Sequence, residues 1–353
     1  MTAGTHGARG PIRLALLGCG RISRLAHLPN ILADSRIELV GIAEADDERR
    51  RSLVREAPGV EVSADVAGLL RSVEPQAVVI ALPTLAHREA ALAAFGVGAH
   101  VFLEKPIAAK REDACAIVRA WRESGRIGMI GFNCRRNHLY LQLRRAIARG
   151  DIGKPVAART AYTAKWPADT TWRLAAETGG GAFLELASHH VDLLRFIFDA
   201  EVRTVIATSW SNRGDDVAGM LQMELSSGVV AHTMVSYGTV EEDRFEVYGS
   251  NGKLTVDRYD SLVVNGRGTD AVGGMTSARR HLTGELRGFR YGIRKRRAPG
   301  EEPSYGETIS AFTEAVLEPK AVAPDIDDGL RALEVIDAAR RSASEHRMIV
   351  VRE

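Results

Sequence analysis

Lys105 lies in the tripeptide Glu104-Lys105-Pro106, which directly follows the apolar run Ala99–Leu103. Proline at position 106 restricts the residue before it to extended conformations, so the lysine side chain is given a defined direction. A lysine at the end of a buried strand can act as an acid/base catalyst when its surroundings tune its pKa. The alternative is a surface lysine in an ordinary strand-to-helix turn.

A second group of polar residues shares one predicted helix. Gly179-Gly180-Gly181 precedes an apolar helix predicted over Ala182–Phe198. Within it, Glu185, His189 and Asp192 stand at i, i+4 and i+7, on one face. A carboxylate one turn from an imidazole can fix the ring tautomer and raise its basicity, so the imidazole can relay a proton. The alternative is a buried ion pair with a structural role only.

A glycine-rich turn near the N-terminus predicts a phosphate-binding loop. The buried strand expected at Ile12–Leu17 is followed by Gly18 and Gly20, and then by an amphipathic helix from about residue 21 to 32. Glycines here allow a tight turn and let the backbone approach a pyrophosphate at the helix N-terminus. Ser23 occupies the third position of the pattern, where glycine is usual, so the motif alone is a weak signal.

Glu44 strengthens the prediction of a dinucleotide site. It ends a second strand, predicted over Glu38–Ala43, at the position where an acidic residue binds the hydroxyls of the adenosine ribose. Its charge would repel a 2′-phosphate, which favours NAD over NADP. Arg49 and Arg50 lie close enough in sequence to keep NADP open. The alternative is that Glu44 only begins the following polar helix, Asp46–Glu56.

The alternation of apolar runs predicts an α/β fold with a parallel, doubly wound sheet. Ligands bind at the carboxyl ends of such strands, so Pro83 and Thr84, which follow the fourth strand, are expected near a cofactor. His87, one turn later, is either a cofactor contact or a packing residue. The strands are predicted at Gln76–Leu82, Ala99–Leu103 and Ile127–Phe132, and the helices at Ala64–Ser72, Leu85–Val97, Arg111–Ser124 and Asn137–Arg149.

A second domain is predicted after Asp151–Pro155, where glycine and proline punctuate the chain. Hairpin turns at Gly228 and Asn251-Gly252 indicate a mostly antiparallel, open sheet. Helices at Tyr305–Leu317 and Asp327–Glu345 are expected to return and brace the structure. The expected division is 1–10 as a disordered tail, 11–150 for dinucleotide binding and 151–353 for substrate binding and oligomerisation. The strands of the second domain are predicted at Val156–Thr163, Val202–Ser211, Ala218–Ser226, Val229–Tyr237, Arg244–Tyr248 and Lys253–Val256.

Over nearly its whole length the chain resembles the glucose-fructose oxidoreductase and inositol dehydrogenase (Gfo/Idh/MocA) family. The resemblance implies an N-terminal Rossmann domain followed by an α+β domain, NAD or NADP as cofactor, and no metal. Lysine, aspartate and histidine catalyse in many members, and they correspond here to Lys105, Glu185 and His189, with glutamate in place of aspartate. The motifs that carry the resemblance are Gly18-Cys-Gly20-Arg-Ile, Thr84-x-x-His87, Glu104-Lys105-Pro106, Gly131-Phe-Asn-x-Arg135, Trp172-Arg173, Gly180-Gly181-Ala-x-Leu-Glu185-x-x-x-His189-x-x-Asp192 and Asp328-Gly329-Leu330.

Besides the three catalytic residues, the resemblance implies two groups of binding residues, and some residues belong to more than one group. Those expected to bind the cofactor are Gly18, Gly20, Arg21, Ile22, Glu44, Pro83, Thr84, His87, Glu104 and Lys105. Those expected to bind the substrate are Lys105, Arg135, Trp172, Arg173, Glu185 and His189.

The function predicted on these grounds is an NAD(P)-dependent dehydrogenase acting on a hydroxyl carbon of a sugar, cyclitol, sugar phosphate or nucleotide sugar. Two alternatives stay open. One is a glycosidase or lyase that oxidises a sugar carbon transiently, and the other is a non-catalytic sensor of dinucleotide or sugar. Because an antiparallel sheet needs its second face covered, a homodimer or homotetramer is expected.

Composition agrees with these expectations. The 353 residues carry a net charge of only +2 and can hold two hydrophobic cores. Three cysteines without metal-like spacing indicate a reducing compartment, and no membrane span or signal peptide is visible, so a cytoplasmic protein is expected.

One segment departs from this even charge. Residues 279–297 hold eight Lys or Arg against the single acid Glu285. A solvated loop is the common outcome for such a run. Because no nucleic-acid recognition module accompanies the charge, a phosphorylated or nucleotide-linked sugar is the better candidate ligand.

Overall fold

The computed structural model describes residues 10–166, 180–212, 215–268, 288–318 and 320–351. By their contacts the residues form two compact units that interleave along the chain. The first unit comprises Met1–Lys105, Cys115–Gly131 and Tyr305–Ile326, and the second comprises Pro106–Ala114, Phe132–Ser304 and Asp327–Glu353.

The first unit is built on a six-stranded parallel sheet in the order β3-β2-β1-β4-β5-β6. This order runs outward in both directions from β1, which is the doubly wound arrangement of dinucleotide-binding folds. The predicted α/β class is therefore confirmed. The strands are β1 (Ile12–Leu17), β2 (Ile37–Ala43), β3 (Glu61–Ser63), β4 (Ala77–Ile80), β5 (His100–Leu103) and β6 (Gly128–Ile130).

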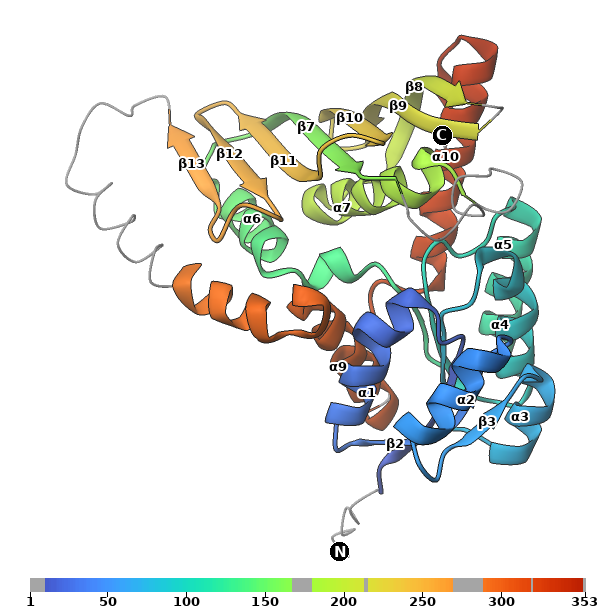
Figure 1. Cartoon of the computed structure of the whole chain (residues 1–353). Helices are drawn as coiled ribbons and strands as arrows, with labels where there is room; N and C mark the ends of the chain where they lie inside the picture. The colour runs from blue at the N-terminus through green and yellow to red at the C-terminus, as the bar shows by residue number, and fades with distance from the viewer. Residues whose placement is uncertain (1–9, 167–179, 213–214, 269–287, 319, 352–353) are drawn as a thin grey trace, which may run out of the picture. The chain divides into compact units, whose positions relative to one another are not determined.

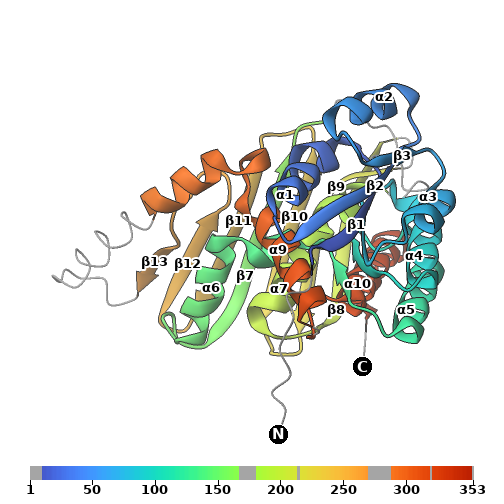
Figure 2. The same cartoon turned by 90° about the horizontal axis from the view of Figure 1, so that it is seen from below.

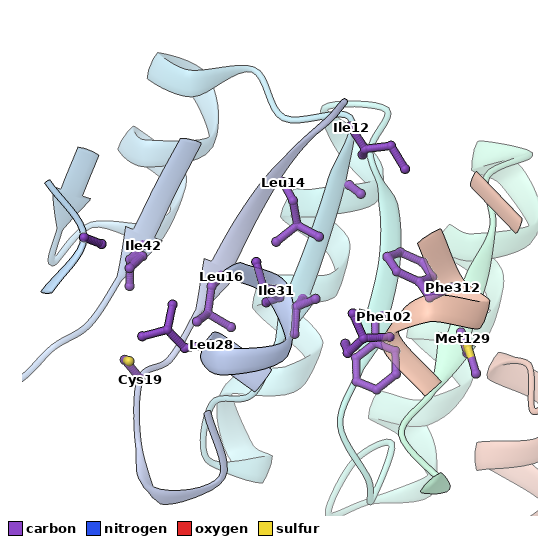
Figure 3. Close-up of a cluster of buried hydrophobic side chains, with 14 of the residues drawn as sticks. Ile12, Leu14, Leu16, Cys19, Leu28, Ile31, Ile42, Phe102, Met129 and Phe312 are labelled. Atoms are coloured by element: carbon purple, nitrogen blue, oxygen red, sulfur yellow. The ribbon is translucent and has the colours of Figure 1, made fainter. Parts of the chain in front are cut away.

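Helices cover both faces of this sheet (Figures 1 and 2). Side chains alternate along each strand, so Leu14 and Leu16 of β1 face one layer of helices, while Ala15 and Leu17 face the other. Figure 3 shows Leu28 and other side chains of the first layer packed over the sheet. The helices are α1 (Leu28–Ala33), α2 (Asp47–Glu56), α3 (Val66–Val73), α4 (His87–Gly96), α5 (Arg111–Ser124) and α9 (Pro303–Leu317).

Helix α9 (Pro303–Leu317) contributes to the core of the first unit although it begins far beyond Ile130, the end of β6, in sequence. Its Phe312 is 1% exposed and packs edge-on against Phe102 of β5, with ring centroids 5.9 Å apart (Figure 3). The chain thus returns to complete this core, in keeping with the predicted returning helix.

The second unit is built on an eight-stranded sheet in the order β13-β12-β11-β7-β10-β9-β8-β14. All neighbouring pairs are antiparallel except β7 and β10, so the expected mostly antiparallel sheet is confirmed. The strands are β7 (Pro155–Ala164), β8 (Val202–Asn212), β9 (Asp215–Leu225), β10 (Val230–Tyr237), β11 (Glu242–Gly249), β12 (Gly252–Asp257), β13 (Asn265–Gly268) and β14 (Ile349–Val350).

The two faces of this sheet differ. One face is covered by α6 (His138–Ala148) and α7 (Ser188–Phe198), as Figure 1 shows. Helix α10 (Ile326–Glu345) also packs against this sheet, where the amide of Ala207 in β8 donates a hydrogen bond to Ser342 Oγ of α10 at 2.9 Å. The opposite face carries apolar side chains that are exposed in the single chain. They are Ile206, Trp210, Met220 and Met234, with exposed fractions of 43%, 62%, 59% and 37%.

Two predicted helices begin differently from expectation. The helices expected from residues 21 and 182 each start with a π-helical turn, Ser23–His27 and Phe183–Ala187, before the regular helices α1 and α7. A single π-turn is too short to leave its own apolar period in the sequence, so periodicity alone predicts a regular α-helix at these positions. The short strands β3, β13 and β14 were not predicted. Within the described residues, every helix is too short or too polar to cross a lipid bilayer.

Candidate functional site

The glycine turn of the first unit has the geometry that a dinucleotide loop requires. Gly18 has φ +89°, and a Cβ at this position would lie 2.6 Å from the carbonyl oxygen of Ala81, so only glycine fits. A Cβ at Gly20 would meet nothing within 4 Å. The main chain at Gly20 is therefore open to a ligand, and the turn fits a pyrophosphate at the start of the following helix.

Ser23 closes this turn. Its hydroxyl donates to the carbonyl oxygen of Gly18 at 2.7 Å, and the side chain is fully buried. The residue that departs from the usual glycine pattern therefore holds the loop in shape. Arg21 is exposed and Ile22 half-buried at the start of the π-turn.

Glu44 is tied to the same turn. Its carboxylate is 5% exposed and accepts hydrogen bonds from the amide of Cys19 at 2.9 Å, the amide of Asp46 at 3.0 Å and the guanidinium of Arg49 at 3.0 Å. Burial alone would raise the pKa of Glu44, but these bonds outweigh it and lower the pKa below its usual value. A fixed negative charge thus stands beside the glycine turn, with the half-exposed Arg49 next to it.

The turn after β4 is shaped by His87. The His87 ring nitrogen Nε2 lies 2.9 Å from the carbonyl oxygen of Leu82, and both His87 and Thr84 are buried, whereas Pro83 is exposed. This contact gives His87 a structural role in holding the turn. Its predicted contact with the cofactor stays a prediction.

Glu104 connects Lys105 to the helix after the glycine turn. It is 8% exposed, and its Oε1 accepts from His27 Nε2 at 2.7 Å while its Oε2 accepts from the amide of Lys105 at 3.1 Å. Burial would raise the pKa of Glu104, but the hydrogen bonds and charges of His27 and Lys105 together outweigh it, and the pKa is lowered. The carboxylate is therefore charged, and His27 carries its proton on Nε2. A Cβ at Gly131 would lie 2.9 Å from Oε2, so glycine there makes room for the carboxylate.

These features lie at one edge of the first unit's sheet. β1, β4 and β5 are adjacent and parallel, so the turns after them meet at the carboxyl edge, where ligands of such folds bind. Gly18, Pro83 and Lys105 follow these three strands directly or within a few residues. The first unit thus brings together the predicted cofactor residues and the half-buried Lys105.

In the second unit, Asp216 of β9 fixes the π-turn that carries Glu185. Its Oδ1 accepts from the amide of Phe183 at 3.1 Å, and Arg340 of α10 donates to its Oδ2 at 3.0 Å and to the carbonyl oxygen of Gly180 at 2.7 Å. A Cβ at Gly181 would collide with the Asp216 carboxylate, so this position requires glycine. Glu185 itself is 7% exposed.

His189 lies one turn later in a largely aromatic setting. Its ring meets Phe132 and Tyr162 edge-on, with centroids 6.2 Å and 5.7 Å away, and it is 8% exposed. Its Nδ1 lies 3.8 Å from the sulfur of Cys134. Glu185 and His189 are thus nearly buried polar groups on one helical segment.

Behind His189, His190 holds α7 to the sheet. Its Nε2 lies 3.0 Å from Asp243 Oδ1, and its ring stacks on Tyr162 at 5.4 Å. Asp243 also binds Arg258 and the hydroxyl of Tyr140. Although burial would raise the pKa of Asp243, Arg258 and His190 outweigh it and hold that pKa well below its usual range.

Arg135 occupies a buried ion network. It binds Asp192 with Nε at 2.9 Å and Nη2 at 2.6 Å, and Asp328 at 3.0 Å. Arg195 joins Asp328 at 3.0 Å and Glu201 at 2.7 Å. Arg135 and Asp192 therefore have structural partners, and the predicted contact of Arg135 with substrate stays untested.

Some predicted residues fall elsewhere. Trp172 and Arg173 lie outside the described residues, as does the first half of the basic segment. Residues 288–297 are helical, and there Lys295 turns inward to donate to the carbonyl oxygens of Arg258 and Tyr259 at 2.8 and 3.0 Å. Arg290 is exposed.

Several residues that shape the site were not predicted from the sequence. They are His27, Cys134, Tyr162, Asp216 and Arg340. His27 follows the glycine turn by two helical turns, and Cys134 stands inside the Gly131–Arg135 motif, so both had a positional signal. Asp216 and Arg340 had none, because their partners are distant in sequence.

Two family models match the chain. The model described as an oxidoreductase family with an NAD-binding Rossmann fold matches residues 12–132. A model of the GFO/IDH/MocA C-terminal domain matches residues 140–255. Together the matches span more than half of the chain.

Relatives and solved structures agree with these matches. A 1,5-anhydro-D-fructose reductase from Ensifer adhaerens is 32% identical over 249 residues, which cover 69% of this chain and 74% of that protein. A myo-inositol 2-dehydrogenase from Thermotoga maritima is 27% identical over 354 residues, covering 97% and 99%. The WlbA dehydrogenase from Bordetella pertussis, solved with NADH and UDP-GlcNAcA, has a TM-score of 0.83 at 24% identity, covering 98% and 99%. At 24% identity, the similarity to the WlbA dehydrogenase concerns the fold alone.

A pH-dependent stability is expected from Asp337 of α10. Burial raises the pKa of Asp337 from 3.8 to about 6, and the lowering effect of Arg340 does not compensate. Because the folded pKa exceeds the ordinary one, the wild-type free energy of unfolding falls as pH rises from about 4 through about 6. Asp337→Asn should therefore be more stable than wild type at pH 8, by about 1 to 3 kcal/mol.

Urea unfolding at pH 8 and at pH 4 tests this expectation. Most of the gain should be lost at pH 4, where the carboxyl is protonated in the folded state and partly protonated in the unfolded state. An equal gain at both pH values would mean that the substitution acts through packing and that the pKa of Asp337 is not raised.

Proposed function

This chain belongs to the GFO/IDH/MocA family of oxidoreductases with an NAD-binding Rossmann fold, and we propose that it transfers a hydride between nicotinamide and a hydroxyl-bearing carbon of a sugar or cyclitol. The observation that carries the proposal is the shared carboxyl edge of β1, β4 and β5, where the open glycine turn and Lys105 both lie. The names of the relatives, a reductase of an anhydro sugar and a dehydrogenase of myo-inositol, support this substrate class. A sugar phosphate or nucleotide sugar belongs to the same class.

Lys105 is proposed as the group that takes the hydroxyl proton during oxidation and returns it during reduction. When bound, the nicotinamide supplies the hydride chemistry. The neighbouring Glu104 is a poor candidate base, because both of its oxygens already accept hydrogen bonds from His27 and from the Lys105 amide. Its role is to hold the main chain of Lys105 in place.

His189 and Glu185 are proposed to bind the reacting hydroxyl of the substrate. The role proposed for Glu185 is to orient that hydroxyl. Both are nearly buried, so a hydrogen bond to substrate would be formed out of bulk water and would be strong. Asp192 is left out of the catalytic set because Arg135 binds both of its oxygens.

Replacing Lys105 tests the catalytic proposal. Lys105→Met keeps the bulk and removes the amine, so kcat should fall by about two to four orders of magnitude while the dissociation constant of NAD stays close to wild type. Lys110→Met is the matched control, since Lys110 is exposed five residues later, and it should retain full activity. Near wild-type turnover of Lys105→Met on the true substrate would remove Lys105 from the acid/base role.

The same assay separates the alternative functions. A dehydrogenase changes the nicotinamide absorbance in proportion to product. A glycosidase or lyase that oxidises a carbon only transiently would form product with no net change in absorbance, and a sensor would bind dinucleotide without turnover.

NAD is proposed as the preferred dinucleotide over NADP. The Glu44 carboxylate is fixed beside the glycine turn and would repel a 2′-phosphate. Glu44→Gln removes the charge and releases Arg49 from its ion pair with Glu44, so it should raise NADP affinity relative to NAD by about tenfold. Titrations of both dinucleotides by protein fluorescence measure the ratio. Wild-type protein that binds NADP more tightly would contradict this role of Glu44.

A homodimer or homotetramer assembled through the open face of the second sheet is also proposed. Three adjacent strands expose the apolar side chains of Trp210, Met220 and Met234. Covering such a surface with a second copy of the chain would remove it from water and lower the free energy. Met220→Arg should lower the molar mass measured by light scattering to that of one chain. Val240→Arg, a control at a residue that is 77% exposed in the loop before β11, should leave the assembly intact. Wild-type protein that is monomeric at micromolar concentration would contradict the proposal.

A further inference from the structure

The thiol of Cys134 faces one ring nitrogen of His189. Cys134 lies in the 3₁₀ turn Asn133–Arg136 after β6 and is 3% exposed. Its sulfur is 3.8 Å from His189 Nδ1, a distance at which a thiol and an imidazole share a hydrogen bond. Which atom donates decides where the neutral ring carries its proton.

The thiol is the donor in this pair. Burial raises the pKa of Cys134 far above neutrality, and the nearby positive charge of Arg258 does not compensate, so the sulfur keeps its hydrogen. A thiol sulfur is a weak acceptor, whereas the bare nitrogen of a neutral imidazole is a good one. Among the residues that the structure describes, a second acceptor near the sulfur, Asn133 Oδ1, lies at 4.0 Å, which is longer.

Two uncharged aromatic side chains flank His189. Phe132 and Tyr162 present ring edges to it, and burial raises the pKa of Tyr162 well above its usual value. On the same helical segment, Glu185 precedes His189 by one turn, His190 is bound to Asp243, and Asp192 is bound by Arg135. The charges of Asp192 and Asp243 are thus matched by partners of their own.

We propose that Cys134 is a positioning residue that holds neutral His189 with its proton on Nε2, so that His189 donates a hydrogen bond to the substrate oxygen and does not accept its proton. The tautomer is a property of the second unit alone, while the donor role rests on the proposed function. In oxidation, a bound nicotinamide would accept the hydride from the C–H bond, the hydroxyl proton would pass to Lys105, and His189 would keep its own proton. Neutral histidine in water also favours the Nε2 proton, so the thiol reinforces the intrinsic preference.

Nitrogen-15 NMR of the full chain, labelled on histidine and free of substrate, tests the tautomer directly. The signals of His189 are assigned by their loss in His189→Asn. Wild type should show an unprotonated Nδ1 and a protonated Nε2. Cys134→Ala should move the two shifts toward each other, Cys134→Ser should restore them because a hydroxyl also donates, and Cys115→Ser should change nothing.

A wild-type proton on Nδ1, or His189 shifts unchanged in a folded Cys134→Ala, would overturn the proposal. If Cys134→Ala does not fold, the wild-type and Cys134→Ser spectra still decide between the two tautomers. Unchanged signals of His27 and His190 serve as the internal measure of folding.

Kinetics then test the donor role. Cys134→Ala should lower kcat about fivefold, the worth of one neutral hydrogen bond, without changing KM for NAD, and Cys134→Ser should remain within about twofold of wild type. A shifted tautomer with unchanged kcat would overturn the donor role while leaving the tautomer assigned. If the wild-type protein turned over none of the sugars and cyclitols tested, the proposed function would be contradicted. The tautomer of His189 measured by NMR would not be affected by that outcome.

Discussion

The hydrogen bond between the buried carboxylate of Glu104 and His27 is the interaction on which the ligand edge of the first unit depends. It joins the end of β5 to the helix that follows the glycine turn, and the other oxygen of Glu104 holds the amide of Lys105. Removing His27 would leave the charge of Glu104 poorly compensated in the interior, at a cost of about 3 to 5 kcal/mol. The glycine turn and Lys105 are therefore fixed relative to each other. A fixed position of Lys105 is what proton transfer between this lysine and a bound substrate requires.

In the second unit, networks of buried ion pairs hold the helix that carries the candidate site residues. Asp192 is fully buried and takes two hydrogen bonds from Arg135, while Asp243 is held by His190 and Arg258. These contacts fix the rotation and position of α7 from two sides. Because the partners of Asp192 and His190 are fixed, the adjacent His189 is presented in one orientation, with Cys134 at its Nδ1.

Two helical segments near the candidate site residues begin with a π-helical turn. Ser23–His27 ends on the histidine that holds Glu104, and Phe183–Ala187 carries Glu185 at its centre. A π-turn is wider than an α-turn and less favourable, so it persists where surrounding contacts compensate. Here those contacts are the Ser23–Gly18 bond in one unit and the Asp216–Phe183 bond in the other.

The sequence by itself determined the order of strands and helices, the glycine turn and the position of Lys105 after β5. These features follow from local rules, namely side-chain periodicity and the freedom of glycine at positive φ, which act over a few residues. Only the tertiary structure decided that Arg135 binds Asp192 and Asp328, which lie 57 and 193 residues away, and that Cys134 meets His189 across 55 residues. It also decided that Ser23 closes the turn in place of glycine. The physical reason is that a polar side chain acquires its partner through burial, and burial is set by how distant elements pack and not by the residues beside it in sequence.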